Sequence, residues 1–92
     1  DDPAYIGEEF TFNCMMDPWV DAYVWGTDVY SADSSVCFAA IHAGLITAAD
    51  GGEITVKIGR GQTSYSGSSR NGIRTRDGNF GDAHHVSFSF IR

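Results

Sequence analysis

The sequence predicts an α+β domain organised around one short, buried helix. The helix is expected in residues 36–43, which are mostly apolar and contain neither Pro nor Gly. Several segments before and after it alternate apolar with polar residues, a pattern typical of half-buried strands. Turn signals rich in Gly, Asp and Asn separate some of these segments, which favours antiparallel sheets around the helix.

The predicted helix has start and stop signals at its two ends. Asp33, Ser34 and Ser35 offer side-chain oxygens that can cap the first backbone N–H groups. Gly44 stands where a left-handed residue can end a helix, which gives a length of about ten residues. Its faces are almost all apolar, and His42 is its only side chain that ionises near neutral pH. A short helix without a polar face should be buried on several sides.

Two strands are expected before the helix and three after it. They cover residues 9–14, 23–25, 53–58, 72–76 and 85–90, with turns at 49–52, 59–61 and 77–82 and a polar loop at 62–71. The alternation points one set of side chains toward the core, namely Phe10, Phe12, Cys14, Ile54, Val56, Ile58, Val86, Phe88 and Phe90. Residues 1–8 are expected to form a linker that leads into a domain of residues 9–92.

The net charge is −6 at pH 7, which argues against binding to nucleic acid or to anionic membranes. The charge is uneven, at −10 for residues 1–53 and +4 for residues 54–92. Two explanations are open. The halves fold together and neutralise each other, or the second half presents a basic patch to an anionic ligand. The sequence has no signal peptide or transmembrane run, and its abrupt ends are expected of a domain cut from a longer protein.

Cys14 and Cys37 are the only cysteines, so one disulfide is the only pairing available. Such a bridge would stabilise the domain by about 3 kcal/mol in the chain-entropy description. Two reduced, buried thiols in a cytosolic protein are the alternative, and the spacing alone does not decide between them. A structural zinc site is not expected, because two cysteines without a C-x-x-C pair do not supply such a site.

Several short motifs carry a resemblance to a known family. Residues 24–30 have the sequence VWGTDVY, and residues 34–46 have SSVCFAAIHAGLI. Four shorter motifs follow in order, namely Gly-Gly at 51–52, YSGS at 65–68, NGI at 71–73 and SF at 87–88. In these motifs, above all Cys-x-Ala-Ala-x-His-x-Gly, the sequence resembles the LCCL domain over about residues 9–92. The resemblance implies a central buried helix wrapped by short antiparallel strands in two small sheets.

The resemblance also implies an extracellular module. LCCL domains usually have four cysteines in two disulfides, and this chain keeps only the pair that ties the first strand to the helix. A Cys14–Cys37 disulfide is therefore expected, and with it a secreted or cell-surface location, extracellular or periplasmic. The family is not known for enzymes, and binding of lipopolysaccharide or other glycans and lipids has been suggested for it. Neighbouring domains of a larger chain are expected partners.

Residues that could carry catalysis or bind metal have simpler explanations. His42 could be a base or a ligand, but the positions three and four residues away hold no carboxylate, which favours a structural histidine. His84 and His85 are adjacent on a predicted strand and would point to opposite faces, which disfavours a shared metal ion. Residues 77–82 are rich in oxygen ligands but lack the spacing of an EF-hand, so a turn is favoured over a calcium site.

No motif for a hydrolase or a nucleotide cofactor is present. The sequence contains no G-x-S-x-G, no G-x-G-x-x-G and no P-loop. The Glu8-Glu9 pair is better explained as a solvated start of a strand than as a pair of catalytic carboxylates. We therefore expect no catalytic residue, no metal and no cofactor.

The polar loop and the strand after it contain the best candidates for ligand binding. Their aromatic, hydroxyl and arginine side chains are typical of sites that bind sugars or charged head groups. Arg74 and Arg76 alternate with Ile73 and Thr75, so both should leave one face of the strand, where an anion could meet them. An ordinary loop with Tyr65 anchored in the core is the alternative. The full candidate set is Trp19, Ser64, Tyr65, Ser68, Arg70, Asn71, Arg74 and Arg76, with His42 and Gly44 as structural residues.

The function expected from the sequence is a non-catalytic extracellular module that binds a glycan or glycolipid-like ligand. The alternative is a structural domain that binds a neighbouring domain or another protein of a secreted or surface assembly. A polar cleft that contains His42 and a carboxylate would instead indicate an enzyme.

Overall fold

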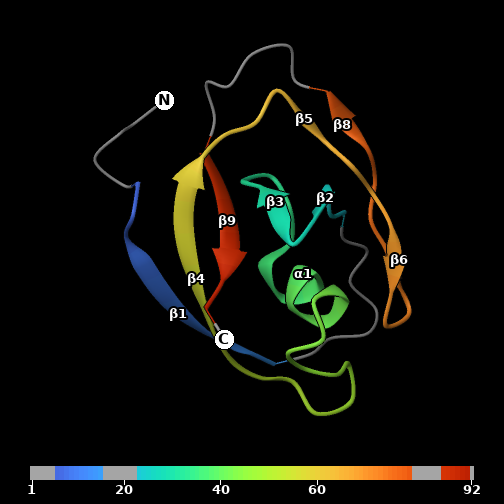
Figure 1. Ribbon diagram of the computed structural model, residues 1–92. Helices are drawn as coiled ribbons and strands as arrows, with labels where there is room; N and C mark the ends of the chain where they lie inside the picture. The colour runs from blue at the N-terminus through green and yellow to red at the C-terminus, as the bar shows by residue number, and fades with distance from the viewer. Residues whose placement is uncertain (1–5, 16–22, 80–85, 92) are drawn as a thin grey trace.

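The computed structural model of the chain describes residues 6–15, 23–79 and 86–91. It confirms the α+β class with one helix at the centre (Figure 1). The elements before the helix are β1 (Glu9–Cys14), β2 (Gly26–Thr27) and β3 (Val29–Ser31), and the helix is α1 (Val36–His42). After it come β4 (Gly52–Arg60), β5 (Ser64–Tyr65), β6 (Ser69–Arg70), β7 (Ile73–Arg74), β8 (Gly78–Asn79) and β9 (Val86–Phe90).

The described strands form three antiparallel sheets, where two small sheets were expected. The main sheet has five strands in the order β1-β4-β9-β3-β2, and β5-β8 and β6-β7 are pairs of two strands. Figure 1 shows α1 between β1, β4 and β9 on one side and β6 and β8 on the other. The helix is therefore enclosed, as its apolar faces require.

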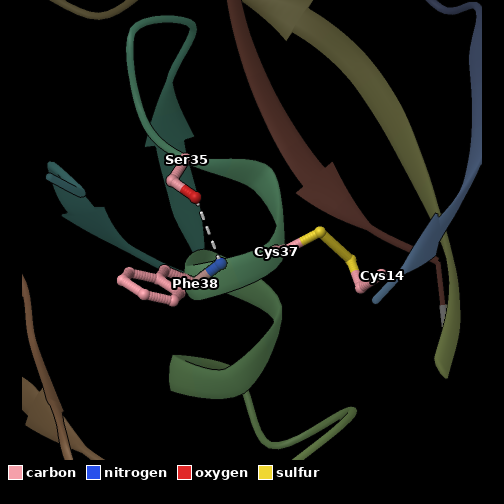
Figure 2. The surroundings of a disulfide bond; sticks show 4 residues. All are labelled: Cys14, Ser35, Cys37 and Phe38. Atoms are coloured by element: carbon pink, nitrogen blue, oxygen red, sulfur yellow. Dashed lines mark hydrogen bonds between the residues drawn. A yellow bond between two sulfur atoms is a disulfide. The ribbon is translucent and has the colours of Figure 1, made fainter. Parts of the chain in front are cut away.

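The helix is shorter than expected, but its end signals are the predicted ones. Ser35 is the N-cap, and its Oγ accepts a hydrogen bond from the Phe38 N–H at 3.4 Å (Figure 2). At the other end, Gly44 has a φ of +86°. The N–H groups of Gly44 and Leu45 donate to the carbonyls of Ile41 and Ala40, each at 3.0 Å. This pair of bonds is the Schellman motif, which ends the helix after seven residues.

A disulfide between Cys14 and Cys37 joins the end of β1 to α1 (Figure 2). The bridge decides between the two predicted states of the cysteines, and no described cysteine is free. It lies beside the buried core, in which Tyr30, Val56 and His42 are the largest fully buried side chains. Other members of the core are Val24, Ala39, Ala40, Ile54 and Phe88.

The β1 side chains that were expected to point toward the core do so, but the rest of the protein covers them only in part. Phe10 pairs with Val56 and Phe12 with Ile54, so both phenylalanines lie on the core side of the sheet. They are nevertheless 38% and 42% exposed. The reason is that β1 is the outermost strand of the sheet.

Several expected boundaries between strands and turns are wrong. The turn at residues 59–61 is wrong, because Gly59 and Arg60 continue β4 in pairs with Ser87 and Val86. Parts of the expected loop and turns are the short strands β5, β6 and β8. Residues 23–25 are not a strand, since Trp25 makes only an isolated bridge to Arg76. Local turn signals did not reveal the end of β4 or the pair β5-β8, because their partners are distant in sequence, whereas β6 pairs with β7 across a two-residue turn.

The pairing between β1 and β4 begins before residue 9. The Gly7 N–H donates to the Ile58 carbonyl at 2.7 Å, and the Ile58 N–H donates to the Glu8 carbonyl at 2.9 Å. Two residues thus oppose one, with Gly7 at a φ of +90°, which is the geometry of a β-bulge. The division at residues 1–8 and 9–92 remains a prediction, although Gly7 and Glu8 already belong to the sheet edge.

Candidate functional site

An open groove of about 780 Å³ lies between the segment before β2 and the hairpin β6-β7. Both arginines of the predicted strand line it, together with two aromatic residues that precede β2. The full lining is Tyr23, Val24, Trp25, Gly67, Ser68, Ser69, Arg74, Thr75, Arg76 and Asp77. Three of the eight candidates from the sequence, Ser68, Arg74 and Arg76, therefore meet in one place.

A tight hairpin sets the direction of Arg74. Asn71 and Gly72 have φ values of +54° and +81°, as a two-residue type I′ turn requires. The turn pairs Ser69 with Arg74 and Arg70 with Ile73. Asn-Gly is a strong hairpin signal, and the sequence contained it where a loop was expected.

Thr75 fixes the opposite face of the same segment. Its side chain is buried, and its Oγ1 accepts from the Ser68 N–H at 2.8 Å and lies 3.2 Å from the Ser68 carbonyl. Since neighbouring residues of an extended segment point to opposite sides, Arg74 and Arg76 point outward, and both are exposed. The predicted alternation is therefore correct.

Arg76 is held against an aromatic side chain. Its backbone N–H donates to the Val24 carbonyl at 2.8 Å, which brings the segment at 75–77 beside residues 23–25. The centre of its guanidinium lies 4.1 Å from the centre of the Tyr23 ring, within cation–π range. The Tyr23 and Trp25 rings lie 6.0 Å apart. Tyr23 is 53% exposed, so its ring is accessible at the groove.

The groove wall at Gly67 has no room for a side chain. A Cβ added there would lie 2.5 Å from the Thr75 carbonyl oxygen, closer than atoms of a real side chain approach. The Gly67 N–H donates to the Asp77 Oδ1 at 2.7 Å. One carboxylate oxygen of Asp77 is thus engaged by the backbone, and the two segments that form the wall are fixed to each other.

A chain of hydrogen bonds ties this wall to the centre of the helix. His42 is fully buried, and its Nδ1 lies 2.9 Å from the Tyr30 hydroxyl. Its Nε2 lies 3.1 Å from the Ser68 Oγ. The Ser68 Oγ lies 2.6 Å from the Thr27 Oγ1, which donates to the Ser66 carbonyl at 2.8 Å.

The carbonyl at the end of this chain fixes the direction of its bonds as far as His42. Thr27 gives its single hydroxyl proton to the Ser66 carbonyl, so it must accept from Ser68. Ser68 in turn accepts from His42, which places a proton on Nε2. In a neutral ring, Nδ1 then accepts from the Tyr30 hydroxyl.

Burial lowers the pKa of His42 below its ordinary value of 6.5. A hydrogen bond with the Ser68 backbone raises the pKa, the charge of Arg70 lowers it further, and that of Asp28 raises it. The lowered pKa favours the neutral ring, in which Nδ1 accepts from the Tyr30 hydroxyl.

The LCCL domain family matches residues 3–85, most of the chain. The chain is an LCCL domain. Human vitrin is 42% identical to it over 73 residues, which is 76% of this chain and 10% of that protein. Human cysteine-rich secretory protein LCCL domain-containing 2 is 38% identical over 63 residues, 68% of this chain and 13% of that protein.

Clotting factor C of Tachypleus tridentatus is 37% identical over 73 residues, 78% of this LCCL domain and 7% of that protein. The chain thus spans about a tenth of the length of these relatives. Its relatives are secreted, multidomain proteins, and the predicted location outside the cytoplasm is confirmed. No described helix is long and apolar enough to cross a membrane.

The remaining candidates of the LCCL domain lie away from the groove or inside the protein. Arg70 forms an exposed ion pair with Asp28 at 2.7 Å. The Asn71 side chain donates to the His42 carbonyl at 2.9 Å and so covers the helix end. Tyr65 is 5% exposed and its hydroxyl accepts from the Gln62 N–H at 3.0 Å, so it supports the segment from inside.

Ser64 is exposed on β5, where it pairs with Asn79, and it does not line the groove. Trp19 lies outside the described residues, as do His84 and His85. Sequence reasoning missed Tyr23, which was assigned to a strand. The signal that could have found it is the alternation of Tyr23 and Trp25 with Val24, because it places two aromatic rings on one face.

Among the described residues of the LCCL domain, no three His, Cys, Asp or Glu side chains lie close enough to hold a metal ion. The candidate calcium segment at 77–82 is described only as far as Asn79. Within that part, Asp77 accepts a backbone hydrogen bond.

Proposed function

We propose that this LCCL domain is a non-catalytic extracellular module that binds an acidic glycan or the head group of a glycolipid-like ligand. The ligand lies in the groove between the aromatic pair Tyr23 and Trp25 and the cationic pair Arg74 and Arg76. The observation that carries the proposal is this pairing of two accessible guanidinium groups with exposed aromatic surface in one open groove.

The cations are available to a ligand. In the described part of the chain, the only salt bridge joins Arg70 to Asp28, so neither Arg74 nor Arg76 is neutralised in this way. Arg76 rests on the Tyr23 ring, which orders its guanidinium without using its hydrogen-bond donors. Arginine binds carboxylate, sulfate and phosphate groups through two parallel N–H donors, and the aromatic faces can cover the apolar side of a sugar ring.

The uneven charge of the sequence supports a local rather than a global attraction. The whole chain carries −6, so an acidic ligand is repelled at long range. At 0.15 M ionic strength the screening length is about 8 Å, and the contact with the two arginines then dominates. Of the two explanations left open by the sequence, a basic patch accounts for Arg74 and Arg76, whereas charge neutralisation accounts for Arg70.

The absence of catalysis is part of the proposal. Both ring nitrogens of His42 are engaged in hydrogen bonds, and the residue is fully buried. It therefore cannot reach a substrate in the groove. Asp77, the carboxylate at the groove, is engaged with the Gly67 N–H through one oxygen.

A glycan array with matched variants tests this proposal. The native chain is expected to bind at least one acidic glycan. Arg74→Ala and Arg76→Ala should each raise the dissociation constant about tenfold, because the loss of one hydrogen bond to a charged group has an effect of that size. Arg60→Ala is the control, because Arg60 is an exposed cation on β4 that does not line the groove. Binding that falls equally in all three variants, or in none, contradicts the assigned site.

The alternative, a module that binds protein, is favoured by a different surface. Phe10 and Phe12 are large apolar side chains that remain substantially exposed on the outermost strand. An array without any glycan hit, together with association through that strand, would favour this alternative.

A further inference from the structure

One edge of strand β1 is not paired with any strand in the described part of the chain. The strand stands at the end of the five-stranded sheet, and among the described strands only β4 pairs with it. Figure 1 shows β1 along the outer side of the sheet. Its six residues are fixed at both ends, by the bulge at Gly7 and Glu8 and by the Cys14–Cys37 disulfide. A rigid, unpaired strand edge is a template for another strand.

The hydrogen-bond pattern shows which backbone groups of β1 point outward. The Ile58 N–H donates to the Glu8 carbonyl, so the even-numbered residues of β4 face β1. The Ile91 N–H donates to the Thr55 carbonyl, so its odd-numbered residues face β9, in agreement. Phe10, Phe12 and Cys14 are opposite Val56, Ile54 and Gly52 and use their backbone groups toward β4. The N–H and C=O groups of Glu9, Thr11 and Asn13 therefore point away from the sheet.

The side chains of β1 alternate between the two faces of the sheet. Phe10 and Phe12 lie on the core side and are 38% and 42% exposed. Glu9, Thr11 and Asn13 lie on the other side, where the Thr11 and Thr55 hydroxyls are 3.0 Å apart. Glu9 is the only charged residue within the strand.

We propose that the edge of β1 binds the β1 edge of a second copy of this chain, in antiparallel pairing with Thr11 opposite Thr11. This register joins the outward groups of Thr11 to each other and those of Glu9 to those of Asn13. It also places Phe10 of each copy opposite Phe12 of the other on the core side, so a dimer contains two of these aromatic pairs.

Three independent conditions meet in this one register. The residues that would exchange hydrogen bonds are those whose backbone groups point outward. The exposed phenylalanines become cross-strand aromatic pairs, which stabilise antiparallel strands. The two Glu9 side chains do not face each other, since each lies opposite Asn13. Any antiparallel strand could meet the first condition, but the other two depend on the sequence of the partner, and a second copy satisfies both in the same register. A second copy is therefore the inferred occupant.

Analytical ultracentrifugation of the 92-residue chain over a wide concentration range tests the proposal. The native chain should dimerise reversibly, and Thr11→Pro should lower the association constant by at least about tenfold, because it removes an outward N–H at the centre of the contact. Proline is tolerated on an edge strand where the N–H faces solvent, so the variant should fold. Its circular dichroism and thermal unfolding check this.

Charge variants at Asn13 provide a test in both directions. Asn13→Lys places a cation opposite Glu9 and should tighten the dimer about threefold or more, whereas Asn13→Glu should weaken it by a similar factor. Gln62→Lys and Gln62→Glu are matched controls, because Gln62 is exposed outside the sheet and the net charge changes equally. A monomeric native chain at every concentration overturns the proposal. So does a dimer that is insensitive to Thr11→Pro and Asn13→Glu.

A cross-linking experiment tests the register itself. In Thr11→Cys the new thiol lies opposite its own copy, so oxidised glutathione should link two chains, with two thiols oxidised to one disulfide and glutathione reduced. In Asn13→Cys the new thiol lies opposite Glu9, and cross-linking should be at least about tenfold slower, since a disulfide needs Cα atoms within about 7 Å. Equal rates in the two variants contradict the register.

Discussion

His42 lies where the helix meets the groove wall, and both of its ring nitrogens are in hydrogen bonds. Tyr30 donates to Nδ1, and Nε2–H donates to Ser68, whose own N–H is bound by Thr75. A protonated ring would carry a hydrogen on Nδ1 as well, so the Tyr30 hydroxyl would have to turn and accept from it. Protonation therefore acts on the bond to Tyr30, whereas the Nε2–H bond to Ser68 is kept.

The pH dependence of stability is the first prediction at this scale. The pKa of His42 is lowered in the folded state, so at pH values below 6.5 the unfolded chain holds more protons at this residue than the folded one. His42 should therefore make the free energy of unfolding fall as the pH decreases through 6.5, until its lowered pKa is reached. Chemical denaturation between pH 8 and pH 5.5 measures this change.

NMR of the His42 ring separates this effect from that of other titrating groups. The nitrogen shifts should show a proton on Nε2 and none on Nδ1 at neutral pH, and the ring should titrate below 6.5. A proton on Nδ1, or titration above 6.5, would contradict the direction of the hydrogen-bond chain.

The sequence predicted a structural His42 because no carboxylate stands at helical spacing from it. It did not reveal Tyr30 and Ser68 as its partners, which are 12 and 26 residues away. The same limit applies to Tyr23, whose role depends on Arg76 from another segment. Local spacing carries information about neighbours within one element, whereas the groove is made by contacts between elements.

The helix α1 is held at its two ends and along one side. The Ser35 side chain accepts from the Phe38 N–H, the Gly44 motif engages the carbonyls of Ile41 and Ala40, and Cys37 binds the helix covalently to β1 (Figure 2). The caps were predictable because they depend on residues adjacent in sequence. The hairpin β6-β7 was equally local, with Asn71-Gly72 as its signal, but residues 62–71 were treated as one loop and the pairing was missed.

Removal of the disulfide is the prediction at the scale of elements. The double variant Cys14→Ser/Cys37→Ser should lose about 3 kcal/mol of the free energy of unfolding, since a loop of this length no longer restricts the unfolded chain. The double replacement leaves no unpaired thiol that could form a mixed disulfide. Urea denaturation of the variant and the native chain at equal pH gives the difference.

Mass spectrometry provides the control for that experiment. The native chain treated with an alkylating reagent in the absence of reductant should gain no mass, because both cysteines are bridged. A gain of two alkyl groups, or a double variant as stable as the native chain, would contradict a stabilising bridge.

The whole molecule is a small sheet and helix unit in which the two proposed interaction surfaces lie on different elements. The groove is formed by the segment before β2 and the hairpin β6-β7, and the proposed pairing edge is β1. A pair of chains joined at β1 would therefore carry two grooves and could bind a repetitive glycan through both. The sequence identified the fold class and the family, because both depend on motifs within α1 and its flanks. It gave no indication of the groove volume or the proposed pairing edge, which depend on strand order.

A ligand in the groove beside Arg74 and Arg76 is tested most directly by an NMR titration of the chain with the strongest acidic glycan found on the array. We predict that the largest shift changes occur at Ser69, Arg74, Arg76 and Tyr23, and that residues of β1 remain unchanged. Changes that concentrate in β1, with Arg74 and Arg76 unaffected, would contradict a binding site in the groove.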